Sequence, residues 1–181
     1  VPGAFNDVAH KNGVKTGCTY FIDWGASVNQ MEEPGKTLYE LATPGTNSYG
    51  DKYKYSRKLI QFLKYYGIDG LCFNPEGYWG FQVYNRFIPF LAECHRIAKE
   101  LNHPFHVDWY AFVSNTGALS DNGCKLTTNN NNWFHHAETN QPVTDVFFLN
   151  YNWSESGLQQ SIETARSHGR STFDVYAGYD M

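Results

Sequence analysis

Residues 59–76 read LIQFLKYYGIDGLCFNPE and join an amphipathic helix to a buried strand. In the first half, leucine and isoleucine recur at helical spacing and the pattern stops at Gly67, which predicts a helix over 53–66. The apolar run 68–74 follows directly and is typical of a strand buried on both faces, as in parallel sheets covered by helices. Such a helix and strand are the repeating elements of an α/β fold.

The same alternation runs through the rest of the chain. Helical spacing closed by a stop residue predicts helices from Ala4 to the Asn12-Gly13 stop, over 53–66, over 81–101 and over 156–168. Continuous apolar or aromatic runs predict strands over 14–23, 68–74, 104–112, 143–151 and 171–179. Residues 114–141 are polar and are expected to form a long connection, which is either solvated or supplies binding residues. The order of elements indicates βα units and the α/β class.

The length of 181 residues limits the architecture. A complete eight-unit β/α barrel needs about 250 residues, so only about five units fit into this chain. No Gly-rich phosphate-binding fingerprint follows a predicted strand, which disfavours an open nucleotide-binding sheet. We therefore expect a (β/α)8 TIM barrel with only about five βα units present. Residues 1–181 would be part of one catalytic domain without an internal boundary, and the remainder of the same enzyme would lie outside them.

Composition narrows the classes of partner. A net charge of −4 argues against nucleic acid as a ligand, and no stretch approaches the ~20 apolar residues of a membrane span. Aromatic residues make up 17% of the chain, and together with many asparagines they suit a carbohydrate, whose rings stack and whose hydroxyls form hydrogen bonds. Cys124, His135 and His136 lack the spacing of a metal motif, so no metal and no other cofactor is expected.

Polar and aromatic side chains follow each predicted strand, at the edge where ligands bind in α/β folds. In chain order these residues are Tyr20, Asp23, Trp24, Asn74, Glu76, Asp108, Trp109, Tyr110, Asn150, Tyr151, Asn152, Trp153, Tyr176, Tyr179 and Asp180. Because the carboxyl ends of parallel strands share one edge of the sheet, the recurrence predicts a binding or catalytic site there.

Among these residues, Asn74 and Glu76 are the pair that most clearly indicates a reaction. Residues two apart on an extended strand point the same way, and Pro75 helps to hold Asn74 extended. An acid beside an amide suits the cleavage of a 2-acetamido sugar, in which the acid protonates the glycosidic oxygen and the substrate's own acetamide attacks the anomeric carbon. The alternative is that both residues only cap the following helix.

Four segments, in order, resemble the endo-β-N-acetylglucosaminidases of glycoside hydrolase family 85. Residues 65–76, YYGIDGLCFNPE, are similar to the catalytic strand of that family. The other three are residues 9–14 with Gly17 and Thr19, residues 147–153 (FFLNYNW) and residues 174–180 (DVYAGYD). Together these segments span nearly the whole chain, so their joint order is more specific than any one motif.

This resemblance implies a (β/α)8 catalytic domain that hydrolyses the GlcNAc-β-1,4-GlcNAc bond in the chitobiose core of N-linked glycans, with retention and without a metal. Carried over by position, Glu76 would be the general acid and then base, Asn74 would hold the acetamide during oxazolinium formation, and Tyr110 would contact the same acetamide. The substrate-binding residues would be Trp24, Asp23, Asn150, Trp153, Tyr179 and Asp180. Bacterial members are usually exported and eukaryotic members can be cytosolic.

The chain departs from the family pattern in the substrate groove. Asp23 stands where the family commonly has Glu, Ala111 and Phe112 replace Asp-Ser, and a Trp-Gln-Asn segment is missing. Two other functions stay open at this point. A retaining glycosidase could use Asp108 or Asp180 as a nucleophile about 5–5.5 Å from the Glu76 carboxyl, or the chain could be a glycan-binding module on a degenerate barrel that has lost turnover.

Overall fold

The computed structural model describes residues 3–22, 39–76, 80–118, 123–138 and 140–180. The helices are α1 (Gly3–Lys11), α3 (Ser56–Tyr66), α4 (Gly80–Glu100) and α5 (Glu155–Ser167). The strands of the main sheet are β1 (Gly17–Ile22), β2 (Gly70–Pro75), β3 (His106–Tyr110), β6 (Val146–Leu149) and β7 (Val175–Ala177). A small hairpin consists of β4 (His135–His136) and β5 (Gln141–Pro142), and single 3-10 turns cover Asn131–Trp133 and Thr172–Asp174.

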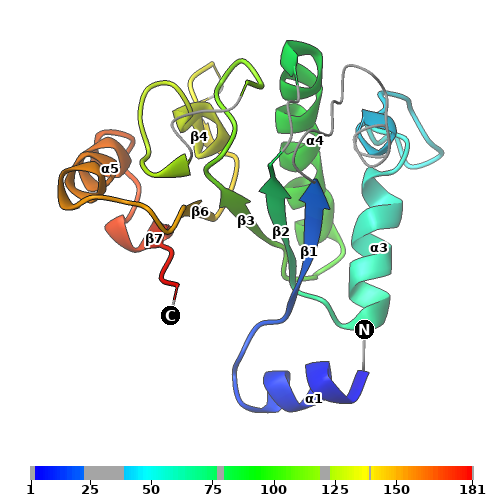
Figure 1. Cartoon of the computed structure of the whole chain (residues 1–181). Coiled ribbons are helices and arrows are strands. Elements are labelled where there is room, and N and C mark those ends of the chain that lie inside the picture. The colour runs from blue at the N-terminus through cyan, green and yellow to red at the C-terminus, as the bar shows by residue number, and fades with distance from the viewer. Residues whose placement is uncertain (1–2, 23–38, 77–79, 119–122, 139, 181) are drawn as a thin grey trace.

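The main sheet has the order β1-β2-β3-β6-β7, and every neighbouring pair is parallel. Chain order and spatial order therefore agree, as successive βα units of a barrel require. In Figure 1, α3 and α4 run alongside β1 and β2, α5 lies beyond β6 and β7, and α1 lies below the amino ends of the strands. The predicted α/β class with five strands is confirmed.

Element boundaries differ from the predictions for local reasons. The helix expected from Tyr53 begins at Ser56, because Tyr53 forms an antiparallel bridge with Pro44 instead. The predicted polar connection 114–141 contains β4 and the first residue of β5. Each of these strands has only two residues, which is too short for a periodic pattern to reveal it. The end of α3 matches the prediction, since Gly67 adopts φ 65° and its N–H bonds back to the helix.

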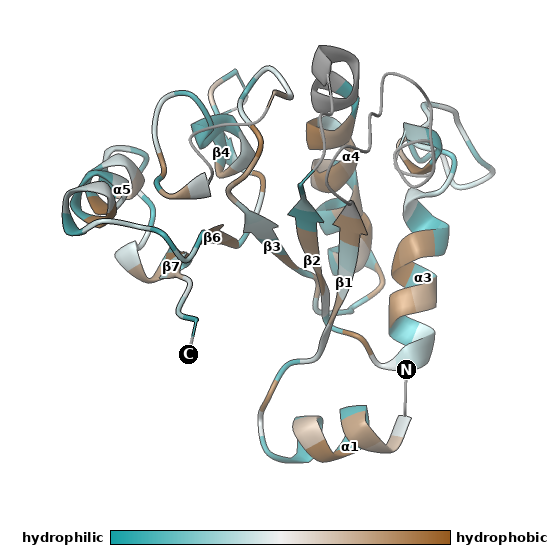
Figure 2. Cartoon of the chain, viewed as in Figure 1, coloured by the Kyte–Doolittle hydropathy of each residue, from teal (hydrophilic) through white to brown (hydrophobic). Residues whose placement is uncertain are grey.

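One face of the sheet packs against helices and forms the core. The side chains of Phe73, Val107, Trp109, Phe147 and Leu149 on this face are at most 1% exposed. Phe73 meets Phe87 of α4 edge-on at 5.2 Å, and Trp109 stacks on Trp133 at 4.1 Å between ring centroids. Figure 2 shows hydrophobic segments of α3 and α4 beside the strands. The opposite face, called the inner face below, carries the alternate residues of each strand.

Polar contacts hold α1 against the amino ends of β1 and β2. Asp69 is 6% exposed, and its Oδ2 accepts the backbone N–H of Thr16 and contacts His10 Nε2, both at 2.7 Å. The Asn6 side-chain amide donates to the carbonyl of Tyr66 at 2.6 Å. Asp69 thus has a structural role at the end of the sheet opposite the predicted site.

A network of ion pairs ties the segment before α3 to α3 and α4. Arg57 donates from Nε to Asp51 Oδ2 at 2.7 Å, and Arg96 donates from Nη2 to Asp51 Oδ1 at 2.8 Å. Glu93 pairs with Arg96, and Glu100 pairs with both Arg57 and Arg96. The Asp51 side chain is fully buried, and its arginine partners hold the pKa of this carboxyl far below its usual range.

None of the described helices is long and apolar enough to cross a membrane. Cys18, Cys72, Cys94 and Cys124 are free thiols.

Candidate active site

A cavity of about 430 Å³ opens on the inner face at the carboxyl ends of the strands. Its volume falls within the range of roughly 300–1,000 Å³ that is typical of small-molecule sites. The lining residues come from all five strands or the turns that follow them. They are Thr19, Cys72, Asn74, Glu76, Asp108, Tyr110, Val146, Phe148, Tyr151 and Tyr176.

Asn74, on β2, and Glu76, directly after β2, both line this cavity, as their two-residue spacing predicts. Asn74 lies opposite Phe21 in the pairing with β1, and the Glu76 N–H returns to the Asn74 carbonyl at 3.2 Å. The Asn74 Oδ1 atom is buried and has no hydrogen-bond partner among the described residues. An unpaired buried acceptor is costly, so it marks a position where a ligand N–H would fit.

Tyr110 enters the cavity from β3 with its ring held on both sides. Its ring stacks on Phe112 at 5.5 Å with an interplanar angle of 22°, and it contacts Phe148 at 5.7 Å. Burial raises the pKa of Tyr110 far above the usual value, and the Glu76 carboxylate raises it further. The hydroxyl therefore stays protonated at neutral pH and can donate a hydrogen bond to a ligand.

Aromatic side chains from β6 and β7 form the other side of the cavity. Phe148 meets Tyr151 edge-on at 6.1 Å, and the residues Tyr151 and Tyr176 are each 52% exposed. Gly178 makes this packing possible, because a Cβ there would lie 2.9 Å from Tyr151 and 3.1 Å from Phe148. Exposed aromatic faces beside polar groups are suited to the C–H faces of sugar rings.

The remaining predicted site residues do not line this cavity in the described part of the chain. Asn150 Oδ1 accepts the N–H of Tyr151 at 2.7 Å, within the turn after β6. Trp153 Nε1 donates to the Gly178 carbonyl at 2.7 Å, and this bond joins the turn after β6 to the turn after β7. Tyr179 and Asp180 are exposed beyond β7. Asp23 and Trp24 belong to residues 23–38, which lie outside the described residues.

The strand-end argument predicted Asp108 but missed the other residues in the lower part of the cavity. Thr19, Cys72, Asp108 and Val146 line this part. They lie side by side on four neighbouring strands, because Cys72 pairs with Thr19 and with Asp108, and Asp108 pairs with Val146. The signal that could have identified Cys72 is the alternation itself, two residues before Asn74. Burial raises the pKa of the Cys72 thiol, and the nearby Asp108 adds to this effect, so the thiol stays protonated.

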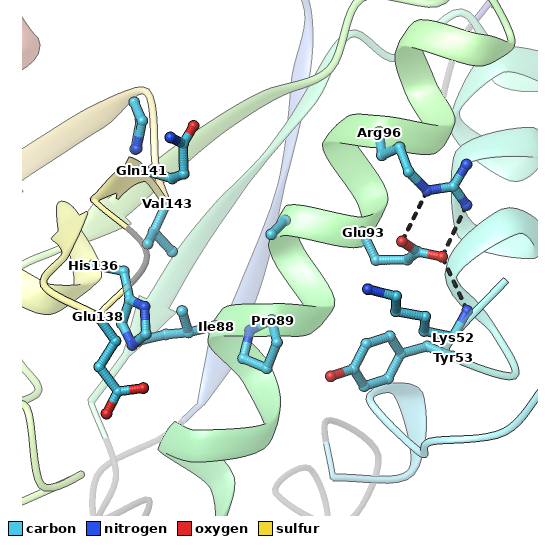
Figure 3. Close-up of a pocket in the computed structure, with 12 residues that line it drawn as sticks. Lys52, Tyr53, Ile88, Pro89, Glu93, Arg96, His136, Glu138, Gln141 and Val143 are labelled. Carbon is cyan, nitrogen blue, oxygen red and sulfur yellow. Dashed lines mark hydrogen bonds and ion pairs between the residues drawn. The ribbon is translucent and has the colours of Figure 1, made fainter.

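A second cavity, of about 640 Å³, lies away from the inner face between α4, residues 52–53 and the β4–β5 hairpin (Figure 3). Its Glu93 carboxylate is already engaged, since Oε1 accepts from Arg96 Nη2 at 2.8 Å and from the Lys52 N–H at 2.9 Å. No predicted site residue that the structure describes lines it. Among the described residues, no cluster of His, Cys, Asp and Glu is arranged to hold a metal ion. The inner-face cavity is therefore the candidate active site.

Comparison with protein families shows which family the chain belongs to. Residues 2–181 match the sequence model of glycosyl hydrolase family 85. The chain belongs to this family. The resemblance predicted from four segments is thereby confirmed, and it extends over nearly the whole chain.

The family 85 chain is similar to longer curated proteins. It is 28% identical over 182 residues to the cytosolic endo-beta-N-acetylglucosaminidase of Danio rerio. This alignment covers 99% of this chain and 22% of that protein. The human protein of the same name is 26% identical, with 99% of this chain and 21% of the relative covered. The chain thus spans about a fifth of the length of these relatives.

A solved structure supports the fold assignment as well. The glycoside hydrolase domain of Endo-D from Streptococcus pneumoniae R6 superimposes with a TM-score of 0.81 at 26% sequence identity. The match covers 98% of this chain and 27% of that chain. The predicted barrel-type arrangement of the family 85 chain is therefore confirmed.

Proposed function

We propose that this chain carries the catalytic residues of an endo-β-N-acetylglucosaminidase. The enzyme would hydrolyse the GlcNAc-β-1,4-GlcNAc bond in the chitobiose core of N-linked glycans. The observation that carries the proposal is the pairing of an acid, Glu76, with an amide acceptor, Asn74 Oδ1, that is buried without a partner in the same cavity. The names of the family 85 relatives support the same activity.

The proposed reaction is retaining and uses the substrate as its own nucleophile. Asn74 Oδ1 accepts the N–H of the substrate acetamide, whose oxygen attacks the anomeric carbon while Glu76 protonates the departing glycosidic oxygen. The anomeric C–O bond breaks and a cyclic oxazolinium ion forms. Glu76, now a carboxylate, removes a proton from water, which opens the ring at the anomeric carbon and restores the acetamide.

Tyr110 is proposed to fix the acetamide from the other side. Its hydroxyl remains protonated, because burial and the Glu76 carboxylate both raise its pKa. A donor held between Phe112 and Phe148 has little freedom to rotate away from the substrate. Such a donor orients the acetamide oxygen toward the anomeric carbon without reorganising during the reaction.

The rival mechanism with a protein nucleophile is less well supported. Asp108 lies opposite Cys72, two residues and roughly 7 Å below the level of Asn74, whereas Glu76 follows beyond the end of β2. The two carboxylates therefore come from different levels of the cavity, whereas a retaining pair needs carboxyls ~5–5.5 Å apart. The Asp108 carboxylate also pairs with His106, which lies toward the amino end of β3. Asp180 is exposed and does not line the cavity.

The rest of the substrate groove is proposed to come from loops around the cavity and from further βα units of the same polypeptide. In the five-stranded sheet, β1 and β7 each have one neighbour, and several inner-face side chains are half-exposed. Additional strands would close the barrel over this face. The proposed glycan contacts are Trp24, Asp23, Asn150, Trp153, Tyr179 and Asp180.

The test uses the full-length polypeptide that contains this chain. It is incubated with an N-glycosylated protein, and released glycans and the remaining protein are read by mass spectrometry. We expect one N-acetylglucosamine to stay on each site, with release reduced at least about a thousandfold in Glu76→Gln and strongly in Asn74→Ala. Glu163→Gln, on the surface of α5, is the matched carboxylate control and should retain full activity.

Two outcomes would contradict the proposal. Full release by Glu76→Gln would remove the proposed acid from the mechanism. No release by the unaltered protein, together with retention of the same glycans on a binding column, would favour the glycan-binding module.

A further inference from the structure

A charged pair occupies the level of the inner face directly below the proposed catalytic residues. Asp108 lies opposite Cys72 on β2 and Val146 on β6, and it lines the same cavity as Asn74 and Glu76. Two residues further along β3, Tyr110 occupies the level of Asn74. Asp108 is therefore about 7 Å below the level at which the acetamide would react, by the rise of two strand residues.

A carboxylate is an unusual residue at this level. The interior layers of β/α barrels are filled mainly by Val, Ile and Leu, as Val146 does here. The Asp108 side chain is 38% exposed in the five-stranded sheet, and the proposed closure of the barrel over this face would bury it. Burying a carboxylate costs several kcal/mol unless a partner compensates its charge. An acid retained in this layer needs a reason beyond packing.

His106 supplies that compensation from below. Its Nε2 lies 2.7 Å from Asp108 Oδ1, and Gly70 on β2 leaves room for it, because a Cβ at position 70 would overlap the His106 carbonyl. The contact with Asp108 raises the pKa of His106 above its usual value, against the effect of burial, and Asp145 raises it further. The raised pKa favours the protonated form of His106. The pairing of the strands places Asp108 toward the cavity and His106 toward the amino ends of the strands.

We propose that Asp108 acts on this site through its charge, and that it stabilises the positive charge that develops on the substrate as the glycosidic bond breaks. The inference rests on the proposed function, because only a reaction through a cationic intermediate places such charge above Asp108. His106 acts through Asp108 as a positioning residue, since it holds the carboxylate in one orientation. Asp108 forms no bond to the sugar.

The first test compares the full-length protein with its isosteric variant Asp108→Asn in steady-state glycan release. We expect kcat to fall roughly tenfold, equivalent to about 1.4 kcal/mol, with KM changed less than about twofold. The matched control Glu163→Gln should leave both constants unchanged. An unchanged kcat in Asp108→Asn would overturn the inference.

A second measurement separates charge stabilisation from a merely structural role. Two inhibitors are compared on each protein, a protonated iminosugar derived from N-acetylglucosamine and a neutral N-acetylglucosamine analogue of the same size. Asp108→Asn should weaken the cationic inhibitor about tenfold relative to the neutral one. The ratio of the two affinities does not depend on the fraction of folded protein. An equal change for both inhibitors would mean that Asp108 only supports the fold.

The Glu76→Gln variant keeps this inference distinct from the proposed function. If that variant retains full glycan release, or if the unaltered protein releases no glycan, the proposed function fails and the inference fails with it. If Glu76→Gln is inactive while Asp108→Asn behaves like the unaltered protein, only the role of Asp108 fails.

Discussion

Tyr110 places one hydroxyl in the candidate site, and Tyr110→Phe removes that oxygen while leaving the ring stacked on Phe112. We expect kcat/KM for glycan release to fall about tenfold to a hundredfold, because one hydrogen bond to the reacting amide is lost. The melting temperature should shift by less than about 2 °C, since the aromatic packing is unchanged. Tyr65→Phe, 82% exposed on α3, is the control. Full activity of Tyr110→Phe would show that this hydroxyl makes no contact in the transition state.

Gly70 is required by the close approach of β2 and β3. An added Cβ would lie 2.8 Å from the carbonyl carbon and 2.9 Å from the Cβ of His106. Backbone cannot move aside as a flexible side chain can, so Gly70→Ala should lower the free energy of unfolding by about 2 kcal/mol or more. Urea denaturation measures this change. Gly45→Ala, whose new Cβ meets only Lys54 at 3.9 Å, should change it by less than about 0.5 kcal/mol.

At the scale of elements, the ion pairs around Asp51 join α3 and α4 to the segment that precedes them. Because the folded state holds the pKa of the buried Asp51 carboxyl far below its value in an unfolded chain, its contribution to stability is present above about pH 4. That contribution is lost as pH falls through the folded-state pKa. Asp51→Asn should lower the free energy of unfolding by about 3 kcal/mol at pH 7 and by less near pH 3.

Urea denaturation between pH 3 and pH 7 (roughly the range over which carboxyls titrate) checks the Asp51 prediction. Asp7→Asn, an exposed carboxylate on α1, provides the matched control and should show no such pH-dependent difference. A difference between Asp51→Asn and the unaltered protein that is equal at both ends of the range would contradict the assigned cause.

The elements themselves were largely predictable from sequence. The β2 prediction, 68–74, differs from the observed Gly70–Pro75 by two residues at one end and one at the other. The β4–β5 hairpin was not predictable, because two residues per strand are too short to show any period. Likewise the start of α3 was decided by the bridge between Tyr53 and Pro44, a contact that the helical spacing of the sequence does not contain.

At the scale of the whole molecule, the two edge strands of the sheet allow a test of whether the barrel closes. In the five-stranded sheet β1 and β7 each pair with one strand only. If further βα units close the barrel, the outward amides of β1 and β7 in the full-length protein should be protected from hydrogen exchange to the same degree as those of β2 and β3. Hydrogen–deuterium exchange with mass spectrometry measures this. Rapid exchange confined to β1 and β7 would show that these strands remain open edges.

The α/β class and the order of the βα units were predictable from the sequence alone, because strand alternation and helix stop signals are local properties of the chain. The same alternation predicted that Asn74 and Glu76 would face one cavity, and their catalytic roles stay a prediction. Tertiary structure alone decided which strand-end residues share the cavity. Trp153 and Asn150 follow a strand as predicted, yet their polar atoms bond to Gly178 and Tyr151. Asp108 stands below Asn74 because parallel pairing sets β3 against β2 in one register, and such a register is a contact between distant segments.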